Sequence, residues 1–229
     1  MVRHDHPEKD ATPCRGGCAD TPQPAGGGWL RRLHAWFLHV YADGYNAKVD
    51  ARKRHLIGDL RGAVLEIGPG SGANIGYFAP GIRWTGVEPN PMAHPYLLRK
   101  ADAAGLDATL LTGTAERLPV PDASQDAVVS TLVLCSVADP DRVLAEVRRV
   151  LRPGGRFVFI EHVGAEPGSG ERRWQRRVKP VWRRLGDGCE PDRDTAGRIR
   201  AAGFARVDIE PFRMPYPIVA PHIAGRAER

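Results

Sequence analysis

Three glycines and an acidic residue in the first half of the chain have the types and spacing that bind a nucleoside-containing ligand. Gly68, Gly70 and Gly72 follow an apolar run, and glycine is needed where a backbone turns sharply close to a ligand. Glu88 stands 20 residues after Gly68, where a carboxylate can accept both hydroxyls of a ribose. The residues that follow the turn are expected to begin a helix, whose first backbone N–H groups would face the ligand.

The glycines by themselves admit two cofactors. They fit E-x-G-x-G-x-G from Glu66, as in S-adenosylmethionine sites, and also the dinucleotide pattern G-x-G-x-x-A if Ala73 takes the third place. No dehydrogenase-type Tyr-x-x-x-Lys pair occurs at a plausible position, which disfavours hydride chemistry with a nicotinamide.

The elements that must position these residues alternate between strand and helix. The pattern predicts strands near 63–67, 83–88, 108–112, 126–134 and 156–163, and two further strand-like stretches at 205–212 and 219–227. Helices are predicted near 73–79, 92–104, 139–151, 171–185 and 193–202, and the L-R-P-G-G stretch that ends at Gly155 should form a turn before the fifth strand. This alternation favours an α/β fold with a doubly wound, mostly parallel, seven-stranded sheet in one domain.

The N-terminal region differs from this pattern. Residues 1–28 are polar and lack apolar periodicity, so we expect a disordered tail before a domain that covers 29–229. Within that domain we expect N-terminal cap helices over 29–60, a cofactor-binding core over 61–165 and substrate-side helices and C-terminal strands over 166–229. Residues 29–41 have the spacing of an amphipathic helix, which could pack on the domain, cover the substrate pocket or lie on a membrane surface.

Composition limits the partners and the compartment. The net charge of +6 lies largely in arginine-rich stretches without interleaved aromatic platforms, which disfavours nucleic acid as a partner. The four cysteines are too few and too unevenly spaced for a disulfide framework, and no apolar run is long enough to span a membrane, so a cytoplasmic protein is expected. Cys14 and Cys18 with His4 and His6 could bind a metal, but no second pair follows, so we expect a tail without metal.

Four separated motifs resolve the choice of cofactor. E-I-G-P-G-S-G, G-V-E-P-N, G-T-A-E-R-L-P-V-P-D and L-R-P-G-G-R-F together resemble the successive motifs of class I S-adenosylmethionine-dependent methyltransferases, which have a Rossmann-like fold. The resemblance implies S-adenosylmethionine as cofactor. It implies that Glu66 supports the glycine turn and approaches the methionine amino group, that Glu88 binds ribose, and that the loop at 114–116 reads adenine. Many members have Asp where Thr114 stands, and that Asp accepts from the adenine amino group; here Thr114 or Glu116 would have to do this. The implied cofactor residues are Glu66, Gly68, Gly70, Gly72, Glu88, Pro89, Thr114, Ala115, Glu116 and Leu132.

Further stretches resemble one group within that class. T-L-V-L-C-S-V, F-I-E-H-V, D-G-C and P-H-I-A-G-R-A are similar to the thiol S-methyltransferases of animal microsomes, the methyltransferase-like 7 proteins, and their bacterial relatives. The resemblance implies methyl transfer to a small lipophilic thiol. N- or O-methylation of a phospholipid head group, amine or quinone is the alternative reaction, and a cofactor-binding protein without catalysis is the alternative outside enzymes.

The residues on the acceptor side follow from thiol chemistry. A thiol reacts as its thiolate, so a base near the acceptor would help, and His162 at the end of the fifth strand and His222 are the candidates. Glu161 should face the side opposite to His162. Trp174 either packs in the core or forms an apolar wall. The expected pocket residues are Trp36, Cys135, Ser136, Trp174 and Asp187.

Overall fold

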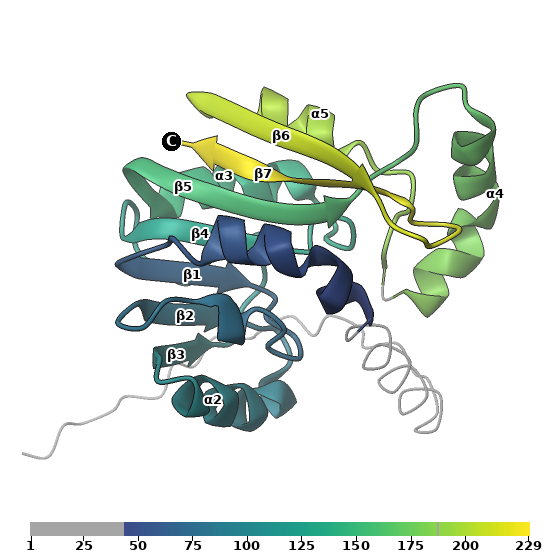
Figure 1. Cartoon of the computed structure of the whole chain (residues 1–229). Coiled ribbons are helices and arrows are strands. Elements are labelled where there is room, and N and C mark those ends of the chain that lie inside the picture. The colour runs from purple at the N-terminus through teal and green to yellow at the C-terminus, as the bar shows by residue number, and fades with distance from the viewer. Residues whose placement is uncertain (1–43, 187) are drawn as a thin grey trace, which may run out of the picture.

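The computed structural model describes residues 44–186 and 188–229 and is built on one seven-stranded sheet. The strand order is β3-β2-β1-β4-β5-β7-β6 (Figure 1). Strands β1 to β5 pair in parallel, whereas β7 is antiparallel to both β5 and β6. The bounds are Ala63–Ile67 (β1), Arg83–Val87 (β2), Asp107–Leu111 (β3), Gln125–Thr131 (β4), Leu151–His162 (β5), Arg206–Arg213 (β6) and Pro221–Glu228 (β7). The expected doubly wound, mostly parallel α/β sheet is confirmed.

Helices cover both faces of the sheet. Leu65 of β1 faces a core that includes α3 (Pro140–Val150) and α5 (Thr195–Ala201). The preceding Val64 faces a second core, which includes the helical segment over 44–57 and α2 (His94–Ala103). Successive residues of a strand point to opposite faces, so a strand buried on both sides is apolar throughout, as β1 is apart from one glutamate.

The prediction of a helix over 73–79 is wrong. Only a single 3₁₀ turn, η1 (Ile75–Tyr77), follows the glycine turn. Gly76 weakens helix formation, and Pro80 forces the residue before it away from helical dihedrals. The segment after the turn therefore offers no long helix whose first N–H groups could face the ligand, and the glycine turn must bind through its own backbone.

The boundary between α3 and β5 also differs from the expectation. Helix α3 ends at Val150, and Leu151 already pairs with Gln125 of β4. The register then shifts, and the next pair is Arg156 with Ala127. The L-R-P-G-G stretch is therefore an irregular start of β5 instead of a separate turn, and a shift of this kind lets the chain keep its strand pairing while it bends.

Helix α4 (Gly170–Leu185) lies beyond the end of the sheet at which β5 terminates (Figure 1). Its one fully buried residue is Gln175, which accepts from the backbone of Ala165 at 2.8 Å and donates to Ile218 at 3.0 Å. Trp174 is 49% exposed, so the expectation that it packs in the core is wrong. Helix α4 contacts the domain through side chains such as Gln175 and Lys179, while most of its residues are exposed.

Several sequence predictions fall on residues beyond the described ranges. They are the polar tail, the amphipathic helix of 29–41 with Trp36, and Asp187. A second N-terminal helix is present over 44–57, as expected. Across residues 44–186 and 188–229, no helix combines the length and apolar character that crossing a bilayer requires.

Candidate active site

One edge of the sheet gathers most of the predicted site residues. The parallel strands β1, β2, β3, β4 and β5 all end there, and antiparallel β7 begins there. Ligands of open α/β sheets bind at the carboxyl ends of the strands, so this edge is the expected place for both cofactor and acceptor. The cofactor residues follow β1, β2, β3 and β4, whereas the acceptor residues follow β4 and β5 or begin β7.

The glycine turn has the form of a ligand-binding backbone. Gly68, Gly70 and Gly72 all have positive φ, between 53° and 69°, a region that residues with a side chain rarely adopt. A Cβ on Gly72 would lie 2.8 Å from Ile75, so this glycine is also required by packing. A Cβ on Gly70 would meet nothing nearer than a carbonyl oxygen at 3.9 Å. Gly70 therefore presents bare backbone to open space, and the turn fits a bound nucleoside.

Glu88 connects the end of β2 to this turn. Its Oε2 accepts from the N–H of Gly70 at 3.1 Å, and its Oε1 accepts from the N–H of Asn90 at 3.0 Å. A carboxylate has about four lone-pair sites, so two acceptor positions remain for ribose hydroxyls. Pro89, between Glu88 and Asn90, lies in the same bend, which leads into η2 (Pro91–Ala93). The placement fits the expected ribose role of Glu88.

Glu66 supports the turn from below. The buried carboxylate accepts from the side-chain N–H groups of Asn74 and Trp84, each at 2.9 Å. Burial raises the pKa of Glu66 to about 7, although both hydrogen bonds oppose this shift. Lys53 is equally buried and donates to Asn46 at 2.7 Å and to the carbonyl of Ala73 at 3.3 Å. Burial lowers the pKa of Lys53 to about 8, with the charge of Glu66 acting against it.

The predicted adenine loop is divided between the core and the surface. Ala115 is buried in the core that also contains Leu65, while Thr114 is exposed. The Glu116 carboxylate accepts from the backbone N–H of Ala138 at 3.0 Å and so joins this loop to the segment after β4. In that segment Leu132 has a φ of 58° and donates its N–H to Ile160 at 2.9 Å.

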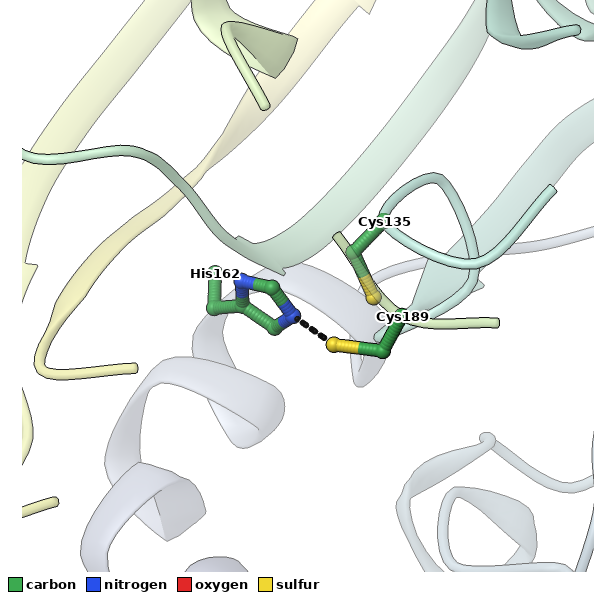
Figure 2. A group of neighbouring side chains, drawn as sticks. All are labelled: Cys135, His162 and Cys189. Atoms are coloured by element: carbon green, nitrogen blue, oxygen red, sulfur yellow. Dashed lines mark hydrogen bonds between the residues drawn. The ribbon is translucent and has the colours of Figure 1, made fainter. Parts of the chain in front are cut away.

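The acceptor side is dominated by a cluster of two thiols and an imidazole. Cys135, His162 and Cys189 are all buried and point toward one another from three separate segments (Figure 2). Nε2 of His162 lies 2.9 Å from Sγ of Cys189, and the indole N–H of Trp182 donates to the same sulfur at 2.9 Å. The hydrogen bond from Cys135 is the main cause that lowers the pKa of Cys189, and the same bond raises the pKa of Cys135. Cys189 is thus the more acidic of the two thiols.

The two candidate histidines are direct neighbours. His222 pairs with His162 across β5 and β7, and their ring centroids are 6.1 Å apart. Nδ1 of His222 lies 3.2 Å from the carbonyl oxygen of Ala220, which makes Nδ1 the donor and leaves Nε2 as the basic nitrogen. Burial lowers the pKa of His222 to about 4, so the ring is neutral at physiological pH.

Three residues of this site lie outside the sequence prediction. Lys53 falls within the apolar stripe formed by Val49, Leu56 and Leu60, and a lysine in such a stripe is the signal that could have found it. Cys189 belongs to the D-G-C stretch, but its position along the chain does not reveal that it lies beside Cys135 and His162. Glu161 was expected opposite to His162, but the sequence does not indicate its role. Its buried carboxylate accepts from the hydroxyl of Ser130 at 2.7 Å and from the N–H of Val133 at 3.2 Å. These bonds fix the start of the segment that carries Cys135 and Ser136.

Comparison with known proteins agrees with this geometry. Residues 65–159 match the model of the methyltransferase domain family. The chain is 39% identical to the human thiol S-methyltransferase TMT1B over 84% of each chain, and 36% identical to human TMT1A over 87% of each. A solved S-adenosylmethionine-dependent methyltransferase from Thermotoga maritima has the same fold, with a TM-score of 0.60 at 22% identity, over 87% of this chain and 95% of that one.

The glycine turn, Glu88 and the acceptor cluster therefore occur together on a methyltransferase sheet, in a chain that resembles the human proteins along most of its length. S-adenosylmethionine is the cofactor of this chain. The chain belongs to the family of S-adenosylmethionine-dependent methyltransferases that contains the thiol S-methyltransferases TMT1A and TMT1B.

Proposed function

We propose that this protein transfers the methyl group of S-adenosylmethionine to the sulfur of a small lipophilic thiol. The observation that carries the thiol acceptor is the 39% identity to TMT1B over 84% of each chain, which extends the likeness beyond the cofactor half of the sheet. The cofactor supplies an activated methyl on a sulfonium sulfur, and this methyl is open to direct in-line displacement by a nucleophile. The protein must then align the acceptor and favour its thiolate, and no covalent enzyme intermediate is needed.

His222 is the proposed proton acceptor for the thiol. Its Nε2 carries the lone pair, its ring is neutral, and it lies at the sheet edge where the acceptor residues gather. His162, the other candidate, already directs Nε2 at Sγ of Cys189, so this nitrogen is engaged within the cluster. Cys135 and Ser136 line the acceptor side; Cys135 is buried, and its sulfur lies 3.5 Å from the hydroxyl of Ser136.

A panel of acceptors tests this proposal. Thiols, amines, phenols and quinols of matched size would be incubated with the protein and S-adenosylmethionine that carries a labelled methyl group, and each product would be identified by mass spectrometry. We expect label on sulfur alone, with rates that increase with the apolar size of the thiol. Label on amines alone would refute the thiol acceptor, and binding of the cofactor without any transfer would favour a protein without catalysis.

A specific feature favours the alternative of a phospholipid head group. Trp174, Val181 and Leu185 lie on one stripe of α4 and are 49%, 62% and 61% exposed, and arginines at 173, 177 and 184 flank this stripe. A basic helix with an exposed apolar stripe suits the surface of an anionic membrane. We propose a cytoplasmic protein that contacts such membranes peripherally, through this stripe and residues 29–41.

Liposome flotation separates membrane contact from the identity of the acceptor. Full-length protein should float with vesicles that contain phosphatidylserine and not with neutral vesicles, and replacing Trp174, Val181 and Leu185 by Ser should lower the fraction that floats. Head-group methylation in the same vesicles would support the alternative acceptor. Equal flotation with both kinds of vesicle would refute the electrostatic part of this proposal.

A further inference from the structure

The three ligand-capable atoms of the acceptor cluster are close enough to share one metal ion. Sγ of Cys135, Nε2 of His162 and Sγ of Cys189 all lie within 4.8 Å of one another. Zinc binds sulfur at about 2.3 Å and imidazole nitrogen at about 2.1 Å, so small side-chain adjustments bring these atoms to tetrahedral spacing. Two thiolates and one imidazole are ligands that zinc prefers over calcium or magnesium.

The backbone holds the cluster together from outside. The N–H of Glu190 donates to the carbonyl of Cys135 at 2.9 Å, which fixes the segment after α4 against the segment after β4. Gly188 has a φ of 83°, and a Cβ there would lie 3.2 Å from the carbonyl oxygen of Ser136, so only glycine permits this approach without strain. The cluster is therefore a consequence of defined packing between two loops that are distant in sequence.

The surroundings of Cys189 resemble the support that a metal-bound thiolate has. The indole N–H of Trp182 points at its sulfur, as N–H groups around bound thiolates do. In the described part of the chain, Nδ1 of His162 is buried without a hydrogen-bond partner, so Nε2 is the nitrogen committed to the cluster. Three protein ligands leave the fourth position of a tetrahedral zinc ion open, which is the arrangement of catalytic zinc sites.

We propose that Cys135, His162 and Cys189 form a zinc site whose open position takes the sulfur of the methyl acceptor; this inference rests on the proposed function in that the acceptor is a thiol. The S–H proton of the acceptor passes to water as its sulfur takes the open position. Its sulfur then forms a bond to the methyl carbon while the bond between this carbon and the sulfonium sulfur breaks. The electron pair of that bond stays on the leaving sulfur, and the products are a neutral thioether and the demethylated cofactor.

The first test measures the zinc content of the protein, and it must exclude zinc that binds to the N-terminal residues. Cys14 and Cys18 offer a second pair of thiols, so the full-length protein would carry Cys14→Ser and Cys18→Ser. It would be prepared with a phosphine reductant, because a thiol reductant is itself a ligand and an acceptor. After equilibration with Zn²⁺ and dialysis we expect about one zinc per chain. A folded protein that binds demethylated cofactor but retains no zinc would overturn the site.

Variants of the cluster assign the ligands. In the same background, Cys189→Ser and His162→Gln should each lose the zinc while they still bind the demethylated cofactor, which shows that they are folded. His55→Gln changes an exposed histidine on the N-terminal helical segment and should keep the metal. Zinc that persists in Cys189→Ser and His162→Gln would overturn the proposed ligands.

Cobalt and a chelator test the open position. With Co²⁺ in place of zinc, addition of an acceptor thiol should change the sulfur-to-cobalt absorption bands, and a matched alcohol should not. Removing zinc with a chelator should lower thiol methylation by at least about 100-fold, and added zinc should restore it. Thiol methylation that is unaffected by zinc removal would overturn this inference and leave the proposed function intact. Bound zinc with methylation of amines alone would refute the proposed function and, with it, the acceptor role of the metal.

Discussion

The carboxylate of Glu88 accepts a hydrogen bond from the backbone N–H of Gly70, with 3.1 Å between oxygen and nitrogen. This contact joins the end of β2 to the glycine turn after β1, two segments that flank the ligand space. The same side chain thus orders the turn and offers its remaining lone pairs to a ribose. Binding and stability must therefore be measured side by side for any variant at this position.

Glu88→Ala should weaken the binding of demethylated cofactor by about 10- to 100-fold, because hydrogen bonds to a charged group contribute roughly 1.5–3 kcal/mol. Calorimetric titration gives the affinity, and thermal unfolding of the same sample shows how much the turn is destabilised. Glu210→Ala, an exposed carboxylate on β6, serves as the control and should bind normally. An unchanged affinity in Glu88→Ala would contradict the ribose role.

Gly70→Ala, compared with Gly105→Ala, distinguishes a loss of cofactor affinity from the loss of stability that a side chain causes at positive φ. Gly70 has a φ of 53° and Gly105 a φ of 68°, and a Cβ at either position meets no close neighbour. Alanine at each should therefore cost about 1 kcal/mol in the free energy of unfolding. Only at Gly70 would the new methyl enter the ligand space, and there cofactor affinity should fall by at least about 10-fold. Equal affinities in the two variants would place the cofactor elsewhere.

Glu66 should make the protein less stable as the pH rises through neutrality. Its pKa is about 7 in the fold against 4.5 as the ordinary value, so the fold favours the protonated carboxyl. The stabilisation is complete below pH 4.5 and is lost as the pH rises through 7. Asn74, Trp84, Lys53 and Lys100 are the groups that oppose this shift.

Urea unfolding at pH 5 and pH 7.5 measures this effect. Relative to the unmodified protein, Glu66→Gln should gain on the order of 2 kcal/mol between the two pH values. Glu210→Gln is the matched surface control and should run parallel to the unmodified protein. A Glu66→Gln curve that also runs parallel to it would show that the carboxyl titrates normally in the fold.

His222→Gln should lower the rate of thiol methylation without a change in cofactor affinity, because its imidazole lies on the acceptor side of the sheet. A general base contributes typically 10²-fold or more, so we expect about a 100-fold loss. The loss should shrink as the pH rises toward the pKa of the free thiol, since the thiolate then forms without help. His55→Gln is the control. A loss that is independent of pH would indicate a structural role for His222.

The arrangement of the glycine turn and Glu88 could be predicted from the sequence, and that of the residues around His162 only in part. The glycines and Glu88 are tied to local backbone geometry, so their spacing along the chain already defines their arrangement. The short turn at η1 escaped prediction because Gly76 and Pro80 outweighed the apolar pattern around Ile75. Cys189 reaches Cys135 and His162 through contacts between remote loops, which spacing along the chain does not encode.

The order of strands also divides the protein into two parts that can vary separately. The glycine turn and Glu88 follow β1 and β2, while His162 and His222 lie at β5 and β7, on the other side of β4. Mutations around the β5–β7 pair can therefore accumulate in a lineage without compensating change at the glycine turn. Relatives with the same methyl donor are then free to diverge in acceptor preference, and the residues to compare among them are those next to His162 and His222.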